Sequence, residues 1–246
     1  MRLILIRHGE PDYEHDTLTE KGWKEAACLA ERTKRWNVQD CFVSPLGRAR
    51  DTARDTLAAW GMKEQILPWL KEYSARIEEP DGSGEVTIPW DLMPEYWTKI
   101  EDMFSLKAWM ETPLMKSGEG NVKSVYEETI EGLDRLLLQY GYERDGKLYR
   151  VRKDNVQEAA SQKDTVVLFC HMGISCVMLS HLLNIPFPAV IHGFFMPPSS
   201  VTVLAAEERE PGTAYFRCQM LGDTSHLRIK GESVSEAGYF AEPFQG

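Results

Sequence analysis

Short, continuous apolar runs followed by charged or turn-forming residues recur along the chain and predict buried strands. Such runs are typical of parallel strands that are covered on both faces. They lie at residues 3–6, 41–43, 66–70 and 165–170. Two further strands are predicted at residues 200–205 and 214–220, separated by a Pro211-Gly212 turn, and an Asp-Gly turn within residues 142–149 predicts a surface hairpin.

Between these runs, apolar residues recur every three or four positions, which predicts amphipathic helices. The helices lie at residues 20–35, 48–60, 125–140 and 175–183. Thr17 or Thr19 can cap the first of them. The polar residues 155–162 predict a helix end or a loop. Because strands alternate with helices, we expect an α/β fold, a three-layer αβα sandwich with a mostly parallel central sheet.

Residues 74–122 interrupt this alternation. A Pro- and Gly-rich loop around residues 80–84 is followed by a stretch rich in aromatic residues and methionine, which predicts two short helices broken near Ser105 and Pro113. We interpret residues 74–122 as a helical cap inserted over the active-site crevice, with aromatic residues that form a small core of their own. Residues 1–246 then form one domain that carries this insertion.

Charged residues that can carry chemistry stand at the predicted strand ends. Arg7 and His8 follow the first strand, and Arg48, Glu72 and His171 follow the next three. In an open α/β sheet, ligands bind at the carboxyl ends of the strands. A neutral imidazole can attack phosphorus, a guanidinium can hold phosphate oxygens, and a carboxyl can donate a proton to a leaving group.

Each of these residues also has an ordinary structural interpretation. The end of the first strand could simply be polar, an arginine such as Arg48 is usually a surface residue, and a lone buried histidine such as His171 is more often structural than catalytic. Glu72 is one of 38 acidic residues. Their shared position at strand ends favours convergence on a single anion.

Composition limits the classes of protein to consider. With 246 residues, 43% of them hydrophobic and 27% charged, the chain is long enough to bury a full core. No apolar stretch approaches the roughly 18 to 20 residues that a membrane span needs, and residues 3–6 are too short for a signal peptide. We therefore expect a cytoplasmic protein without membrane partners.

Charge and cysteine usage exclude further partners. The formal net charge of −10 repels nucleic acid and anionic lipid, so an anionic substrate needs a local basic pocket. The cysteines are scattered and form no CxxC pair, which argues for reduced thiols and against zinc or disulfides. They are Cys28, Cys41, Cys170, Cys176 and Cys218.

Four motifs occur in an order that resembles the histidine phosphatase superfamily, which includes cofactor-dependent phosphoglycerate mutases and many small-molecule phosphatases. The motifs are Arg7-His8-Gly9-Glu10, Ser44-Pro45 with Arg48-Ala49 and Thr52-Ala53, Glu72 after Leu70, and His171-Met172-Gly173. The resemblance extends over residues 1–204, with residues 74–122 as a variable insert.

The resemblance implies a role for each of these residues. His8 would form a phosphohistidine, Arg7, Arg48 and His171 would bind the phosphate, and Glu72 would be the general acid. The catalytic residues would be His8, Glu72 and His171, with no metal and no cofactor. The substrate would be a small-molecule phosphomonoester.

Some features depart from the family pattern. Met172 separates His171 from Gly173, where glycine usually follows the histidine directly. The motif around Glu72 is loose, so Glu78 or Glu79 could serve instead. The segment after Glu10 lacks the pattern of the mutases' substrate loop.

We therefore expect a phosphomonoesterase of the histidine acid phosphatase type that acts on a small metabolite. A phosphoglycerate-type mutase and a non-catalytic phosphate-binding module are the alternatives. The oligomeric state stays open, a homodimer included. The carboxyl-terminal stretch with Asp223 and His226 is expected to cover an edge strand rather than close over the site.

Overall fold

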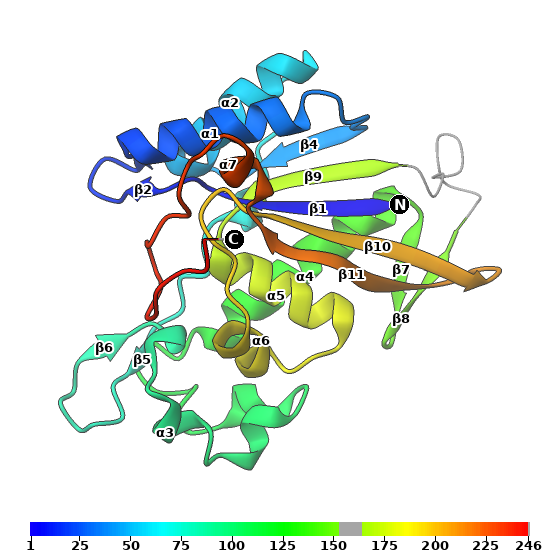
Figure 1. Cartoon of the computed structure of the whole chain (residues 1–246). Coiled ribbons are helices and arrows are strands. Elements are labelled where there is room, and N and C mark those ends of the chain that lie inside the picture. Colours follow the sequence, from blue (N-terminus) through cyan, green and yellow to red (C-terminus); the bar gives the residue numbers. More distant parts are fainter. Residues whose placement is uncertain (153–163, 246) are drawn as a thin grey trace.

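The computed structural model describes residues 1–152 and 164–245, which fold around a central sheet with helices on both faces (Figure 1). The strand order in the sheet is β4-β9-β1-β10-β11-β8-β7. The bounds are β1 (Arg2–Arg7), β4 (Asp40–Val43), β7 (Tyr142–Asp145), β8 (Leu148–Val151), β9 (Thr165–Cys170), β10 (Val201–Glu210) and β11 (Thr213–Asp223). The predicted α/β class is confirmed.

The sheet is mixed rather than mostly parallel, which corrects one detail of the prediction. Only β4, β9 and β1 run parallel to one another, whereas β10, β11, β8 and β7 pair in antiparallel fashion. Two of the antiparallel pairs, β7–β8 and β10–β11, are hairpins closed by tight turns at Gly146 and Gly212, whose φ angles of 60° and 84° suit glycine. The predicted surface hairpin, β7–β8, consequently extends the edge of the main sheet.

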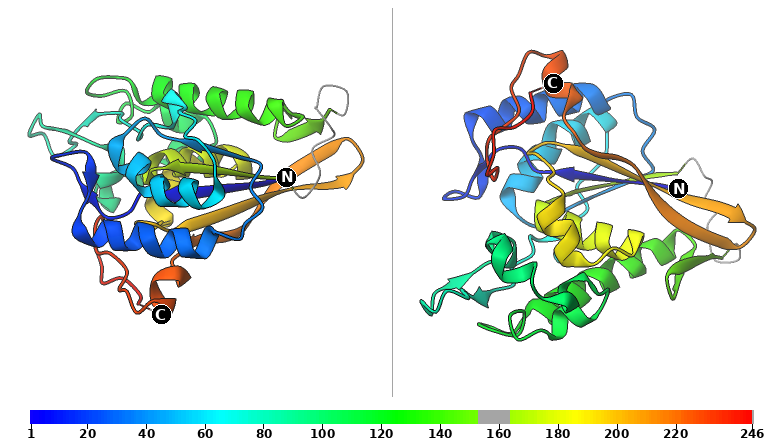
Figure 2. Two further views of the ribbon diagram at one scale, coloured as in Figure 1. Left: turned by 90° about the horizontal axis from the view of Figure 1, so that it is seen from above. Right: turned by 60° about the horizontal axis from the view of Figure 1, so that its bottom comes forward.

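The helices form the two outer layers, as the views in Figure 2 show. One layer holds α1 (Glu20–Thr33), α2 (Gly47–Trp60) and α7 (Ser225–Ile229), and the other holds α4 (Val122–Gln139), α5 (Met172–Leu183) and α6 (Phe187–Gly193). Thr19 caps α1, because its side chain accepts a hydrogen bond from the backbone N–H of Gly22. α5 begins at Met172, directly after β9.

Successive side chains of a strand point to opposite faces of the sheet, so each face has its own hydrophobic core beneath the helices that cover it. Ile4 and Ile6 pack with Leu29 of α1 and Leu57 of α2, among other buried residues. Leu3 and Leu5 belong to the larger core on the opposite face, which contains α4, α5 and α6. Because both faces of β1 are covered, its carboxyl end is fixed from both sides.

The predicted strand at residues 66–70 is wrong. Ile66 forms a single parallel bridge with Val43, and the chain then turns into the 3-10 helix η1 (Pro68–Leu70). Pro68 has no backbone N–H to donate, so it cannot continue a strand ladder. The predicted helix end or loop at residues 155–162 lies outside the described residues.

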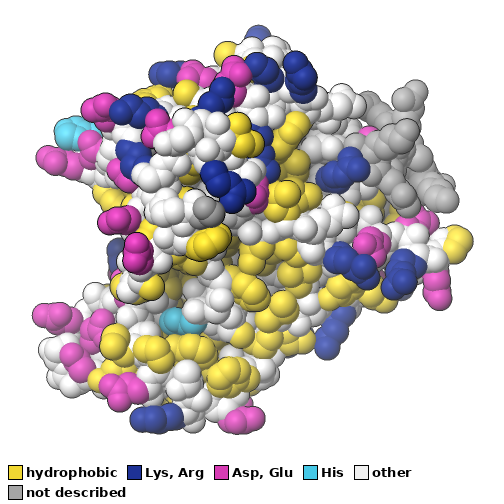
Figure 3. Space-filling model, viewed as in Figure 1, with side chains coloured by type: hydrophobic (Ala, Val, Ile, Leu, Met, Phe, Trp, Pro, Cys, Tyr) yellow, Lys and Arg dark blue, Asp and Glu magenta, His cyan; other side chains and the backbone are white. Residues whose placement is uncertain are grey.

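Residues 74–122 consist of a hairpin and single helical turns instead of two short helices. The elements are β5 (Ile77–Glu78), β6 (Val86–Thr87), η2 (Pro89–Asp91), α3 (Pro94–Trp97), η3 (Glu101–Phe104) and η4 (Ala108–Glu111). The expectation of a separate aromatic core is wrong, since Trp109 contacts Tyr126 and Phe187 of the main core. Figure 3 shows the outline of the molecule hollowed beside this insert.

The chain after β11 does not cover an edge strand, contrary to expectation. α7 packs on α1, and the sheet edges are β4 and β7. Ser235 donates a hydrogen bond to the carboxylate of Glu10, 2.6 Å away, just beyond β1.

A short antiparallel pair, β2 (Pro11–Asp12) and β3 (Thr17–Leu18), follows Glu10. No helix among the described residues is long and apolar enough to cross a membrane.

Candidate active site

The two histidines predicted at strand ends lie side by side. β1 and β9 are parallel neighbours, and their register pairs Arg7 with Cys170, so His8 and His171 leave the sheet together. Their ring centroids are 5.1 Å apart. Both side chains are buried at the carboxyl edge of the sheet. The register of two parallel strands therefore brings together residues that are far apart in sequence.

The His8 ring is fixed in one tautomer. Its Nδ1 lies 2.7 Å from the carbonyl oxygen of Gly9. A carbonyl can only accept, so Nδ1 carries the hydrogen and Nε2 keeps its lone pair, an assignment made from the hydrogen bond. Burial, and then the positive charge of Arg7, hold the pKa of His8 well below its usual range. The ring is therefore neutral, and Nε2 is available as a nucleophile.

Gly9 permits the loop after His8 to lie against α1. A Cβ atom at this position would come within 2.9 Å of the carbonyl oxygen of Gly22, which is backbone and cannot move aside cheaply. The N–H of Gly9 donates to the hydroxyl of Thr52, and that hydroxyl donates to the carbonyl of Arg48. The loop that holds His8 is thereby tied to the helix that carries Arg48.

His171 is oriented by Ser44 at the end of β4. The Ser44 hydroxyl lies 2.6 Å from Nε2 of His171 and accepts a hydrogen bond from the N–H of Leu46. Since its own hydrogen is not used in that bond, we assign the hydroxyl as donor to Nε2, which places the imidazole hydrogen on Nδ1. Nδ1 has no partner among the described residues. It is thus a buried donor that can serve a phosphate oxygen.

Within the described part of the chain, the hydrogen-bond and ring contacts of Arg7 are with neutral groups, while Glu72 and Glu25 act on its charge from farther away. One nitrogen donates to the carbonyl of Met196 at 2.6 Å and approaches the sulfur of Met172, and the guanidinium lies over the ring of Phe195. Burial lowers the pKa of Arg7 from its ordinary value. Because neither a carbonyl nor a ring neutralises the charge, Arg7 remains a strong electrostatic partner for an anion.

Arg48, at the start of α2, is held by Asp16. The two side chains form an ion pair at 2.6 Å, and the other carboxylate oxygen of Asp16 accepts from the N–H of Gly47. The Arg48 guanidinium also lies over the ring of Tyr13. Asp16 adopts a left-handed φ of 48°, which brings its backbone against Gly47. Arg48 is therefore positioned by the loop between β1 and α1.

Glu72 lies at the amino-terminal end of α5 although no strand precedes it. One carboxylate oxygen accepts from the N–H groups of Tyr73 and Ile174, at 2.8 and 3.1 Å. Burial raises the pKa of Glu72 above its ordinary value, while these hydrogen bonds act in the opposite direction. Glu78 and Glu79, the other acids considered, belong to or follow strand β5 of the insert hairpin.

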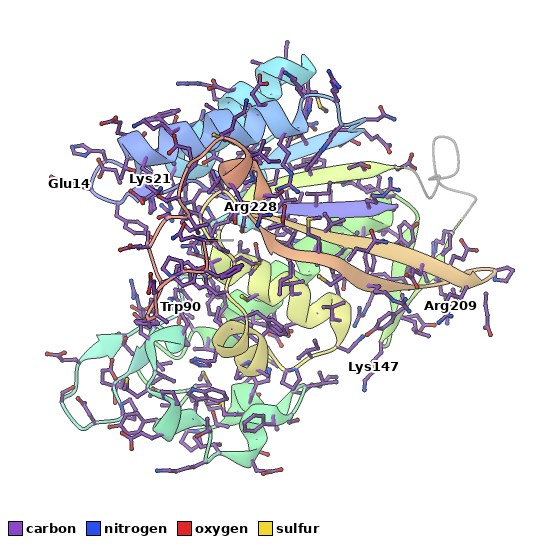
Figure 4. All side chains as sticks on the ribbon, viewed as in Figure 1. Glu14, Lys21, Trp90, Lys147, Arg209 and Arg228 are labelled. Carbon is purple, nitrogen blue, oxygen red and sulfur yellow. The ribbon has the colours of Figure 1, made fainter. Side chains whose placement is uncertain are left out.

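Gly173 and Trp90 delimit the Glu72 side of the site. A Cβ atom on Gly173 would lie 2.8 Å from the Glu72 carboxylate and 3.4 Å from the Trp90 ring. Figure 4 labels Trp90 on the part of the insert nearest the sheet. In the family pattern a glycine follows the histidine directly. In this chain Met172 follows His171, and the next residue, Gly173, leaves room for the Glu72 carboxylate.

Several supporting residues were missed by the sequence analysis. Glu25 is fully buried in α1, where its carboxylate accepts from the N–H of Glu10 at 2.7 Å, and burial raises its pKa to about 7. Asp16 and the contact of Ser44 with His171 were also missed. Glu25 could have been suspected, because it occupies a position on the apolar face of a helix. The other two depend on loop geometry that has no sequence signal.

The arrangement can bind and transfer a phosphoryl group. Two guanidinium groups and an imidazole N–H can bind an anion within a chain of net charge −10. The same edge of the sheet also carries a neutral imidazole, His8, and a carboxyl of raised pKa, Glu72. Among residues 1–152 and 164–245, no group of three or more His, Cys, Asp and Glu side chains is arranged to hold a metal ion.

Comparison with known proteins agrees with this geometry. Residues 3–84 match the family model of the histidine phosphatase superfamily (branch 1). An adenosylcobalamin/alpha-ribazole phosphatase of Salmonella typhi is 24% identical over 204 residues, which cover 78% of this chain and 84% of the relative. The resemblance to this superfamily is therefore confirmed.

Two solved structures are similar to the whole fold. A phosphoserine phosphatase from Entamoeba histolytica, in complex with phosphoserine, has a TM-score of 0.59 at 21% identity, over 92% of this chain and 98% of that chain. The alpha-ribazole phosphatase from Shigella flexneri has a TM-score of 0.57 at 19% identity, over 91% and 97%. At these identities the likeness establishes the fold.

Proposed function

Starting from the match to the histidine phosphatase superfamily, we propose that this protein is a phosphomonoesterase that hydrolyses a small phosphorylated metabolite through a phosphohistidine on His8. The observation that carries the proposal is the state of the His8 ring. It is neutral, its Nδ1 hydrogen is directed to the Gly9 carbonyl, and Nε2 has no hydrogen bond to any residue in 1–152 or 164–245 and lies beside His171. A nucleophilic imidazole needs these three properties.

In the first step, Nε2 of His8 attacks phosphorus and the bond between phosphorus and the ester oxygen breaks. Arg7, Arg48 and Nδ1 of His171 stabilise the charge that develops on the phosphoryl oxygens. Glu72, whose pKa is raised by burial, gives its proton to the departing alkoxide. The alcohol leaves, and His8 carries the phosphoryl group.

In the second step, the Glu72 carboxylate accepts a proton from water while the water oxygen attacks phosphorus. The bond between Nε2 and phosphorus breaks, inorganic phosphate leaves, and His8 returns to its neutral state. Glu72 ends the cycle protonated, ready for the next ester. One carboxyl therefore acts as acid and then as base, as microscopic reversibility requires.

The relatives support a small phosphorylated substrate. The similar proteins are described as phosphatases of alpha-ribazole and of phosphoserine. We place residues 74–122 as a cap beside the site, since Trp90 approaches Gly173 and the carboxylate of Glu72. The five free cysteines support a reducing, cytoplasmic setting.

Phosphate release from a panel of phosphomonoesters tests the proposal, beginning with p-nitrophenyl phosphate. Native protein should release phosphate, and His8→Ala should release none. His15→Ala is the matched control, because His15 is an exposed histidine paired with Asp12 and should keep native activity. A panel without turnover would contradict the proposal. Turnover only in the presence of a bisphosphate, with isomerised ester as product, would favour the mutase.

A further inference from the structure

The carboxyl-terminal segment, residues 233–245, passes beside Arg7. Tyr239 lies against Phe195 with ring centroids 3.9 Å apart, and Phe195 is the ring beneath the Arg7 guanidinium, 5.3 Å from its central carbon. A Cβ atom on Gly238 would lie 3.5 Å from the outer nitrogen of Arg7. Arg7, Phe195 and Tyr239 thus lie in consecutive contact, with the two rings inclined at 47° to each other. This group, called the stack below, joins β1, the chain before β10 and the carboxyl-terminal segment.

We propose that Tyr239 is a positioning residue for the phosphate site, holding Phe195 against Arg7 so that the guanidinium keeps the orientation an anion requires. The inference rests on the proposed function, because it concerns how the same phosphate is bound. It assigns the carboxyl-terminal segment a part in the active site, although the segment lies beyond the four family motifs.

The need for such a device follows from the contacts of Arg7. Arg48 is oriented by the carboxylate of Asp16, whereas the contacts of Arg7 are a carbonyl, a sulfur atom and an aromatic face. The Nε atom of Arg7 has no hydrogen-bond partner within the described part of the chain. An aromatic ring that is held by a second ring can orient a guanidinium and leave its positive charge available to an anion. A carboxylate would orient the guanidinium but neutralise its charge.

The segment has other attachments, so Tyr239 is not required merely to hold it in place. Ser235 donates to Glu10, and Lys21 donates to the carbonyl and hydroxyl of Ser233. Within the segment, the N–H of Val234 donates to the side chain of Gln245. Tyr239 is partly buried, and burial raises the pKa of its phenol while Arg7 acts in the opposite direction.

Tyr239→Ala, Tyr239→Phe and Phe240→Ala provide the test. Phe240 is adjacent, aromatic and 90% exposed, so its substitution matches the loss of a ring without touching the stack. Binding of tungstate, a phosphate mimic, is measured by calorimetry, and kcat and KM are measured with p-nitrophenyl phosphate. Thermal unfolding of each variant reports on the fold independently.

Tyr239→Ala should weaken tungstate binding and raise KM by up to about tenfold, as expected for the loss of the aromatic pair that holds Phe195 against Arg7. kcat should change less than KM, since His8 and Glu72 are untouched. Tyr239→Phe should restore both values, because the ring and not the hydroxyl makes the stack. Phe240→Ala should behave as native protein.

Equal tungstate affinity in Tyr239→Ala and Phe240→Ala would overturn the inference, and so would a failure of Tyr239→Phe to restore binding. Native protein that bound no tungstate would also contradict it. The proposed function fails differently. If native protein bound tungstate but hydrolysed no ester, the phosphatase proposal would be contradicted while the comparison of Tyr239 variants still decided the role of the stack.

Discussion

Ser44 and His171 are 127 positions apart and are joined by a hydrogen bond of 2.6 Å between the serine hydroxyl and Nε2 of the imidazole. This bond determines which nitrogen of His171 carries the hydrogen that faces the phosphate. It exists because β4 and β9 are parallel neighbours whose carboxyl ends coincide, with Val43 opposite Phe169.

Ser44→Ala should lower kcat/KM by about tenfold or more, the usual effect of losing a hydrogen bond that orients a catalytic ligand. Without the hydroxyl, His171 can rotate or place its hydrogen on Nε2. Ser175→Ala is the control, since that hydroxyl donates to the backbone carbonyl of His171 rather than to the ring. Steady-state kinetics of the two variants should differ, and equal losses would argue against control of the tautomer.

Glu72→Gln should slow the hydrolysis of esters whose leaving group needs a proton more than that of esters whose leaving group does not. An amide cannot donate the proton, so hydrolysis of alkyl phosphates should fall by roughly 10²- to 10⁴-fold. Formation of the phosphoenzyme from p-nitrophenyl phosphate should fall less, because a nitrophenolate leaves without protonation. Rapid-mixing measurements of the first step with both esters provide the comparison. An equal reduction for both would exclude Glu72 as the acid.

Gly173→Ala should also impair proton donation to the leaving group, because the added methyl group would displace the Glu72 carboxylate. The new methyl group would lie 2.8 Å from the Glu72 carboxylate and 3.0 Å from the Cβ of Tyr73, so the carboxylate must move. We expect kcat to fall by about tenfold or more, measured on alkyl phosphates. Gly193→Ala is the matched control, a helical glycine whose Cβ would meet nothing within 4 Å. Native activity of Gly173→Ala would contradict the placement of Glu72.

Glu25 should make stability depend on pH. Burial raises its pKa from 4.5 to about 7, with Lys21, Glu10 and Arg7 as the charged neighbours. Between these values the folded state holds the proton and the unfolded chain does not. The contribution of Glu25 is therefore complete below pH 4.5 and is lost as pH rises to about 7, a decrease of about 3 kcal/mol.

Glu25→Gln removes this titration with little change in shape. The difference in unfolding free energy between variant and native protein should shift toward the variant by about 3 kcal/mol as pH rises from 4.5 to 7. Urea unfolding at several pH values measures the difference, and other acids cancel because both proteins contain them. A difference that did not change with pH would show that Glu25 is ionised throughout.

The sequence predicted the sheet class and the strand ends because these depend on local pattern. Apolar runs such as residues 165–170 can only be buried, and charged residues directly after them must emerge at the sheet edge. His8 and His171 could therefore be paired from sequence. Glu72 was placed near them for a wrong reason, since Pro68 starts a 3-10 helix where a strand was predicted.

The unpredicted parts depend on contacts between distant segments. The antiparallel pairing of β10 with β1 and of β11 with β8 joins strands that are far apart in the sequence, and the Arg48 ion pair depends on the left-handed backbone at Asp16. Neither leaves a periodic signal. The stack of Tyr239 on Phe195 joins segments 44 positions apart, and nothing in the composition of either distinguishes it from an ordinary aromatic contact.

The mass of the intact protein, measured after a rapid quench without acid during turnover of a phosphomonoester, tests the central claim most directly. Native protein should carry one phosphoryl group, located on His8 by fragmentation, and His8→Ala should carry none. Turnover by native protein with no adduct, or with the same adduct on His8→Ala, would contradict the phosphohistidine mechanism.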